Sequence, residues 1–131
     1  MEENNKYILD MKDLVVHYET DRGIVEAVNG MDIQLKHGQT LGLVGETGSG
    51  KTTTALSILR LIQSPPGVIK GGSIVVDGKD ILNASKKELE TIRGNVVSMI
   101  FQDPMTSLNP VLTVGEQIAE VISRHEKISK K

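Results

Sequence analysis

The residues with the clearest chemical potential in this chain form one short run. Residues 45–52 read Gly-Glu-Thr-Gly-Ser-Gly-Lys-Thr and match G-x-x-x-x-G-K-[ST], the pattern of a phosphate-binding loop, or P-loop. A triphosphate carries several negative charges in a small volume, and glycines leave backbone N–H groups bare, so that they can converge on it. We therefore expect residues 45–52 to bind the phosphates of a nucleotide.

Side chains at the end of the P-loop complete the expected phosphate chemistry. Lys51 should reach the β- and γ-phosphates, and the Thr52 hydroxyl should bind Mg²⁺. Thr53 adds a hydroxyl that we place nearer the α-phosphate. The predicted nucleotide-binding residues of this segment are Gly45, Glu46, Thr47, Gly48, Ser49, Gly50, Lys51, Thr52 and Thr53.

The flanking segments match the elements that such a loop requires. Residues 39–44 end in apolar residues and predict a buried strand, and residues 52–62 predict a helix. The apolar residues at helical spacing are Ala55, Ile58, Leu59 and Ile62. A helix that begins at the loop presents its positive end to the phosphates. The order strand, loop, helix favours a P-loop over a simple Gly/Ser turn.

Further strands and helices are predicted elsewhere. Strand patterns occupy residues 7–18 (with a bulge near 10–13), 24–35, 73–77 and 95–101. Asp77-Gly78 is a hairpin-type turn. Ser85–Glu88 and Thr113–Glu116 have the pattern of a capping box, and they predict helices that run to about Arg93 and Arg124.

Composition limits the class of protein. The chain has 131 residues and a net charge of −2, and because no basic stripe stands out, we expect no nucleic-acid partner. The absence of cysteine excludes disulfides and thiolate metal sites. No apolar run approaches the roughly 18 residues of a membrane span. Residues 1–6 are polar, unlike a signal peptide, so we expect a cytoplasmic protein. We also expect these residues to form a flexible tail.

Several stretches together resemble the nucleotide-binding subunits of ABC transporters, over about residues 7–125. They are residues 14–18, 27–35, 38–44, the P-loop, and 99–110. Many NTPases share the P-loop. Residues 99–110, Met-Ile-Phe-Gln-Asp-Pro-Met-Thr-Ser-Leu-Asn-Pro, are similar to the Q-loop region of importers for oligopeptides, dipeptides and nickel. The resemblance implies an α/β fold: an incomplete P-loop NTPase core, an antiparallel β subdomain and the start of a helical subdomain.

The resemblance also implies roles for two residues outside the P-loop. Tyr18 matches the aromatic residue that stacks on adenine, a contact worth about 1–3 kcal/mol in nucleic-acid recognition. By sequence alone, an ordinary tyrosine at a strand end fits equally well. Gln102 matches the Q-loop glutamine, which approaches Mg²⁺ or the attacking water, although by sequence alone it reads as a polar turn residue. The implied cofactors are ATP and Mg²⁺, the implied catalytic residues are Lys51 and Gln102, and the implied Mg²⁺ contacts are Thr52 and Gln102.

The resemblance further implies an organisation and partners. Residues 7–101 would form the β subdomain and P-loop core, and residues 102–131 the Q-loop and a truncated helical subdomain. The full subunit would hydrolyse ATP to energise uptake of peptides or nickel. Its partners would be membrane-spanning permease subunits and a second ATPase subunit, identical or different. It would lie on the inner face of the cell membrane as a peripheral protein.

Some family motifs are missing from this sequence: the L-S-G-G-Q signature, a Walker B strand ending in Asp-Glu, and the switch histidine. We therefore expect the first part of a longer subunit, which binds ATP but hydrolyses it poorly. Exposed sheet edges should make it weakly stable or prone to associate. One alternative is a nucleotide-binding regulatory or structural module without turnover. Another is a small-molecule kinase, which the few scattered arginines disfavour.

Overall fold

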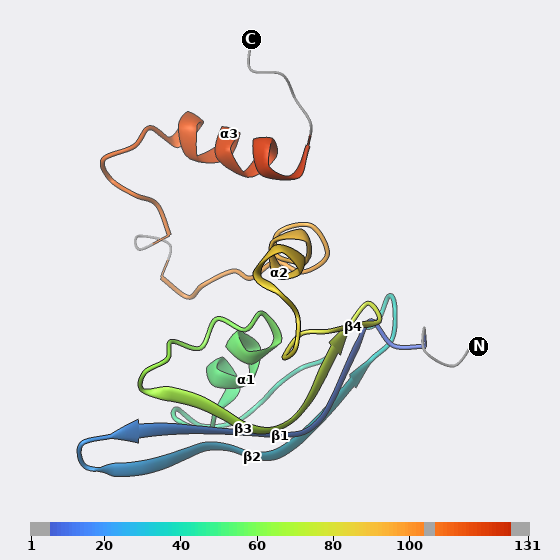
Figure 1. Ribbon diagram of the computed structural model, residues 1–131, viewed down its shortest axis with the longest axis vertical. Coiled ribbons are helices and arrows are strands. Elements are labelled where there is room, and N and C mark those ends of the chain that lie inside the picture. The colour runs from blue at the N-terminus through green and yellow to red at the C-terminus, as the bar shows by residue number, and fades with distance from the viewer. Residues whose placement is uncertain (1–5, 104–106, 127–131) are drawn as a thin grey trace. The chain divides into compact units, whose positions relative to one another are not determined.

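The computed structural model describes residues 6–103 and 107–126 and divides into two compact units, Met1–Ser85 and Lys86–Lys131. The elements, in chain order, are β1 (Leu9–Thr20), β2 (Gly23–Leu35), α1 (Lys51–Ile58), β3 (Gly67–Val76), β4 (Lys79–Asp80), α2 (Lys86–Ile92) and α3 (Val114–His125) (Figure 1). Most of the predicted tail, part of the predicted Q-loop region (104–106) and the chain end lie outside the described residues.

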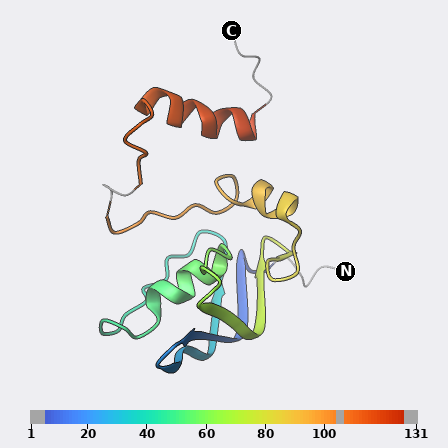
Figure 2. The same cartoon turned by 60° about the vertical axis from the view of Figure 1, so that its left-hand side comes forward.

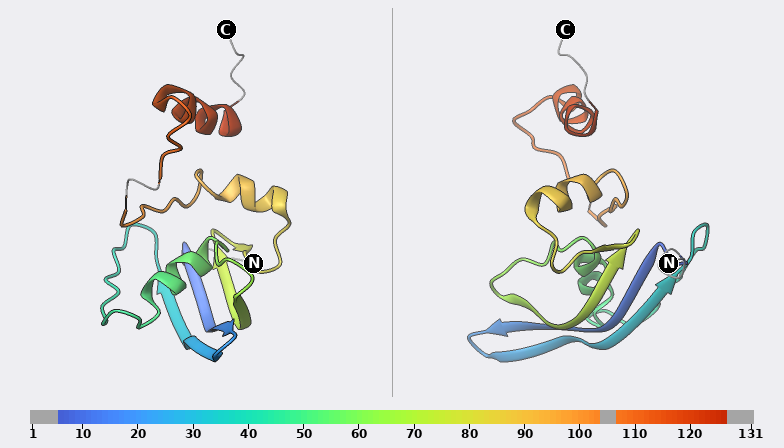
Figure 3. Two further views of the ribbon diagram at one scale, coloured as in Figure 1. Left: turned by 90° about the vertical axis from the view of Figure 1, so that its left-hand side faces the viewer. Right: turned by 45° about the vertical axis from the view of Figure 1, so that its right-hand side comes forward.

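The first unit is built on an antiparallel sheet with the strand order β2-β1-β3-β4 (Figure 3). β1 pairs with both long neighbours, and its inward side chains form the core. The fully or nearly fully buried residues of β1 and β3 are Leu9, Met11, Leu14, Val16, Ile74 and Val76. Aliphatic side chains therefore supply this core, as expected for a chain with three aromatic residues.

The predicted bulge in the first strand is confirmed. Pairing shifts register between Met11 and Leu14, so both side chains point into the core although an odd number of positions separates them. Asp13 takes a φ of 47°, and its N–H donates to Asp32 Oδ1 of β2 at 2.6 Å. The bulge inserts residues into β1, and the side chains on either side of it still alternate so that the same face is buried.

The predicted strand at 73–77 is confirmed but begins earlier, at Gly67, because its glycine-rich first half also pairs with β1. The hairpin turn is confirmed as well. Asp77 and Gly78 both take positive φ, 48° and 73°, as a two-residue turn between antiparallel strands requires.

α1 packs on the sheet of its unit, against β2 and β3 (Figure 2). Its buried side chains are Thr54 and Ser57, whose hydroxyls donate to carbonyl oxygens of Gly50 (2.9 Å) and Thr53 (2.7 Å). Small side chains with satisfied hydroxyls let the helix lie close to the strands. The predicted apolar face is only partly correct, since Ala55 and Ile58 are half-buried, and the helix ends at Ile58 rather than Ile62.

Two strand predictions are wrong. Residues 39–44 and 95–101 form no strand, and Val44 and Ile100 are 94% and 96% exposed. A strand needs a neighbour to pair with its N–H and C=O groups. In the described ranges, 6–103 and 107–126, the sheet pairs only β1 to β4, and 95–101 makes one isolated bridge, between Val97 and Arg93. The apolar composition of both segments indicated burial, but among the described residues no strand pairs with either segment to bury it.

Both helices predicted from capping boxes are present in the second unit. α2 buries Leu89 and Ile92 and is followed by Gly94 at a φ of 82°. α3 begins with a complete capping box, in which Glu116 N–H donates to Thr113 Oγ1 (3.2 Å) and Thr113 N–H donates to Glu116 Oε2 (2.9 Å). Its apolar residues are exposed. Across the described residues, no helix is long and apolar enough to cross a membrane.

Candidate functional site: the phosphate-binding loop

The side chain of Lys51 turns back over the P-loop. Its Nζ donates to the carbonyl oxygens of Gly45 and Glu46, both at 2.6 Å, and to Ser49 Oγ at 3.1 Å. An ammonium has three N–H donors, so these oxygens satisfy it completely. The loop thereby holds a fixed positive charge at the first position of α1.

The P-loop glycines serve different purposes. At Gly45, an added Cβ would lie 2.5 Å from Ser49 Oγ, and at Gly50 it would lie 2.3 Å from the carbonyl oxygen of Ala27 in β2. Glycine is therefore needed for close approach of backbone at Gly50, whereas at Gly45 the neighbour is a serine hydroxyl, which can rotate away. Gly48 has a φ of 85° with open space around it, so the backbone conformation is what favours glycine there.

The start of α1 is arranged for an anion, whereas the start of α3 is not. α1 has Gly50 at its N-cap, with no side-chain cap and no acidic residue in its first turn. The first N–H groups of a helix lack intrahelical partners and carry a partial positive charge. At α3 the side chains of Thr113 and Glu116 satisfy and neutralise this end. At α1 the donors remain for a ligand, and Lys51 adds a full charge.

Tyr18 lies beside this helix start. Its hydroxyl is 3.3 Å from Thr53 Oγ1, across 35 positions of sequence, and its side chain is half-buried. The ring lies close to Gly67, where an added Cβ would be 3.1 Å from Tyr18 Cε1. Folding thus brings Tyr18 to the P-loop helix.

The remaining predicted residues lie as follows. Thr52 is exposed in the first turn of α1. Gln102 is exposed and belongs to the second unit. Among the described residues, no group of three or more His, Asp or Glu side chains could hold a metal ion. The Thr52 hydroxyl is a ligand of the kind that Mg²⁺ accepts beside phosphate oxygens.

Glu19, the residue after Tyr18, forms an ion pair. Lys70 of β3 donates a hydrogen bond to Glu19, and this bond together with the positive charge of Lys70 lowers the pKa of the Glu19 carboxyl. The ion pair is exposed and joins β1 to β3.

Four contacts of this site were not predicted from the sequence. They are the Ser49 hydroxyl on Lys51, the Ala27 carbonyl near Gly50, Gly67 near the Tyr18 ring, and the Tyr18 hydroxyl on Thr53. Only the first is local enough to be sought within the motif. Gly67 follows two prolines and reads as the end of a loop, so nothing in its neighbourhood indicates an aromatic contact.

Comparison with known proteins decides the family. The sequence profile described as ABC transporter matches residues 28–131, most of the chain. The chain belongs to the ABC transporter family. The predicted resemblance to ATP-binding subunits of the oligopeptide and dipeptide type is also confirmed by similar sequences.

Three relatives of this ABC-family chain illustrate the likeness. The oligopeptide transport ATP-binding protein OppD of Bacillus subtilis (strain 168) is 50% identical over 123 residues, which cover 94% of this chain and 34% of OppD. OppD of Escherichia coli (strain K12) is 47% identical, with 94% and 36% covered. The dipeptide transport protein DppD of B. subtilis is 45% identical, with 95% and 37% covered. The chain thus spans little more than a third of their length.

The fold is that of an ABC ATPase, as predicted. A solved dimeric structure of the ATP-binding cassette MJ0796, in a post-hydrolysis state bound to ADP and Pi, superposes with a TM-score of 0.75. The match covers 94% of this chain and 50% of MJ0796, at 21% sequence identity. Likeness at this identity concerns the fold alone, so residue roles must be argued from the site itself.

Proposed function

We propose that this chain is the nucleotide-binding part of an ATP-binding subunit that energises the import of peptides. The observation that carries the proposal is the uncapped start of α1, where the P-loop holds the Lys51 ammonium on three oxygens. These oxygens are neutral acceptors, and phosphate oxygens are anionic, so a nucleotide can replace them with stronger partners. The names of the oligopeptide and dipeptide relatives support peptides as the cargo.

Each site residue has a proposed role. Lys51 and the first N–H groups of α1 hold the β- and γ-phosphates, and Thr53 contacts the α-phosphate. Tyr18 stacks on adenine. Mg²⁺, when bound, neutralises charge between the β- and γ-phosphates, and Thr52 and Gln102 are its proposed protein contacts.

We also propose the wider assembly that these roles require. The partners are membrane-spanning permease subunits and a second ATPase subunit, and the location is the inner face of the cell membrane. In this proposal residues 102–131 carry the Q-loop and the start of a helical subdomain that transmits motion to the permease. The full subunit is an ATP hydrolase, whereas residues 1–131 alone bind ATP and turn it over slowly.

A nucleotide-binding module without turnover is the second candidate. It uses the same observation, the uncapped start of α1 with Lys51 at its first position, as a phosphate site, and differs from the first candidate only in having no turnover. ATP affinity and phosphate release, measured separately, distinguish the two candidates. Phosphate release that remains at the background rate in the full-length subunit, despite ATP binding, would establish the module.

Lys51→Ala tests the site itself. Loss of a charge-assisted contact worth about 1.5–3 kcal/mol should weaken Mg-ATP binding about 10- to 100-fold in calorimetric titration. Lys79→Ala in β4 is the matched control, because Lys79 is an exposed lysine outside the P-loop. Thermal melting of both variants checks that they are folded. Unchanged ATP affinity in folded Lys51→Ala would refute the proposal.

A further inference from the structure

The hydroxyl groups of Tyr18 and Thr53 join β1 to the first turn of α1 through one side-chain hydrogen bond, 3.3 Å long. We propose that Thr53 is a positioning residue, which orients the Tyr18 ring for the base and links base recognition to phosphate recognition. The inference rests on the proposed function, because it takes Tyr18 as the residue that stacks on adenine.

Both ends of this hydrogen bond are on fixed backbone. Tyr18 is paired on two sides, with Val25 of β2 and Gly67 of β3. Thr53 lies in α1, and its carbonyl oxygen accepts a 2.7 Å hydrogen bond from the buried Ser57 hydroxyl. A tyrosine side chain has two rotatable bonds before its ring. The phenol oxygen lies on the Cβ–Cγ axis, so holding it at Thr53 fixes the direction in which the ring points from β1 and leaves the rotation of the ring plane to its other neighbours.

Gly67 provides a second constraint on the ring. An added Cβ there would lie 3.1 Å from Tyr18 Cε1, so a side chain at this position would press on the ring by a few tenths of an ångström, and it would clash more severely with Ile62 Cγ2 at 2.3 Å. The ring is thus held at its tip by Thr53 and lies close to Gly67, while the side chain remains half-exposed. The exposed part of the ring is the part that we propose stacks on the base.

The chemistry of the hydroxyls sets the direction of the hydrogen bonds. Thr53 has a single O–H, and a phosphate oxygen can only accept. When Thr53 donates to the α-phosphate, it must accept from Tyr18, which makes the phenol the donor. The result is a chain from Tyr18 O–H to Thr53 Oγ1 to phosphate, in which each hydrogen bond polarises the next. A residue beside the base and a residue beside the phosphates then act as one unit.

Two substitutions and two ligands test this linkage. Tyr18→Phe keeps the ring and removes the hydroxyl, and Thr53→Val keeps the shape and removes the partner. The ligands are Mg-ATP and Mg-tripolyphosphate, which has phosphates but no base. We expect Tyr18→Phe to weaken ATP binding about 2- to 10-fold, the range of one neutral hydrogen bond, and to weaken tripolyphosphate binding less. Equal weakening of both ligands would overturn the proposal, since the ring would then have no part in the effect.

The double variant measures the coupling directly. If the two hydroxyls act together, Tyr18→Phe should change ATP affinity less than about 2-fold in a Thr53→Val background. Independent, multiplying effects would overturn the proposal. Thr53→Ser restores a hydroxyl and should recover most of the affinity lost in Thr53→Val. Tyr7→Phe is the matched control, since Tyr7 lies outside the sheet and the P-loop and should leave both affinities unchanged.

Tyrosine fluorescence provides a readout of the Tyr18 hydroxyl that does not depend on the overall stability of the folded protein. The chain has two tyrosines and no tryptophan, so in a Tyr7→Phe background Tyr18 is the single strong emitter. Thr53→Val should change its emission without nucleotide, and Thr53→Ser should not. Identical emission in all three proteins would count against the hydrogen bond.

Tyr18→Ala separates this proposal from the proposed function. If it binds ATP as tightly as the unaltered protein, stacking itself is refuted. If Tyr18→Ala binds weakly and Tyr18→Phe binds normally, stacking stands and only the role of Thr53 fails.

Discussion

Gly50 lies so close to the backbone of Ala27 that a methyl group added at Gly50 would lie 2.3 Å from the Ala27 carbonyl oxygen. Ala27 belongs to β2 and Gly50 is the N-cap of α1, so the P-loop approaches the sheet here more closely than a side chain would allow. Gly48 has nearly the same φ, 85° against 84°, but has nothing within 4 Å of the corresponding position. The two glycines therefore separate the effect of conformation from the effect of contact.

Gly50→Ala should destabilise the protein more than Gly48→Ala. Both substitutions pay about 1 kcal/mol for a side chain at positive φ. Only Gly50→Ala adds a clash with backbone, and moving the loop or the strand should cost about 1–3 kcal/mol more. Denaturant unfolding of both variants gives the comparison. Equal losses of stability would mean that the contact contributes nothing.

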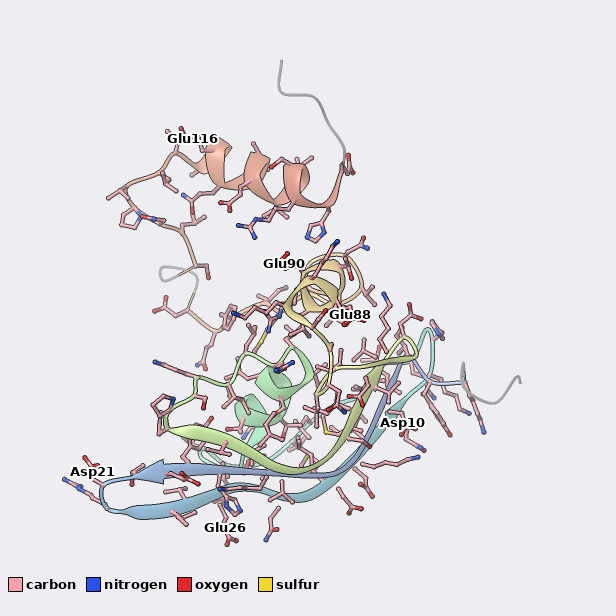
Figure 4. All side chains as sticks on the ribbon, in the orientation of Figure 1. Asp10, Asp21, Glu26, Glu88, Glu90 and Glu116 are labelled. Atoms are coloured by element: carbon pink, nitrogen blue, oxygen red, sulfur yellow. The ribbon has the colours of Figure 1, made fainter. Side chains whose placement is uncertain are left out.

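Asp32 should stabilise the bulge of β1, since its carboxylate accepts the Asp13 N–H at 2.6 Å. We expect Asp32→Ala to cost about 1 kcal/mol of unfolding free energy, and Asp32→Asn less, because the amide oxygen still accepts. Asp21, at the tip of the β1–β2 turn, is an exposed aspartate for the matched Asp21→Ala control (Figure 4). The interpretation fails if the two alanine variants melt alike.

Glu116 should make the start of α3 pH-dependent (Figure 4). Two hydrogen bonds lower the pKa of the Glu116 carboxyl: the larger effect comes from the Thr113 N–H and the smaller from the Thr113 hydroxyl. A lowered folded pKa stabilises the capped helix above the unfolded pKa, and this stabilisation is lost as pH falls through the folded pKa. The Thr113 amide resonance should follow that titration in NMR spectra, and Glu116→Gln should abolish the step. A midpoint at or above the ordinary glutamate pKa would contradict the cap.

Exposed apolar residues outside the sheet should drive association. Ile100, with 96% of its surface exposed, lies in a segment that reads as a buried strand. We expect concentration-dependent self-association in sedimentation experiments, and Ile100→Ser should reduce it, because the substitution removes apolar surface. Ser98→Ala, at a nearby exposed position, is the control. A protein that stays monomeric at every concentration would exclude this expectation.

Two segments show what sequence patterns fail to predict. Residues 39–44 and 95–101 have the composition of buried strands, but a strand is buried only when a second segment pairs with it or packs on it. A capping box or a two-residue turn needs only neighbours in sequence, and so the helix start at Thr113 and the turn at Asp77-Gly78 were predicted correctly. Pairing across long separations carries no such local signal.

The sequence by itself determined the P-loop, its lysine and the family, because these depend on residue types at fixed short spacing. Only the tertiary structure decided what surrounds them. It placed the Ala27 carbonyl against Gly50, and it brought the Tyr18 hydroxyl to Thr53. These contacts join residues far apart in the chain, and they arise from the pairing of β1 with β2 and β3 and the packing of α1 on the sheet. Chain folding, rather than local pattern, sets which atoms meet.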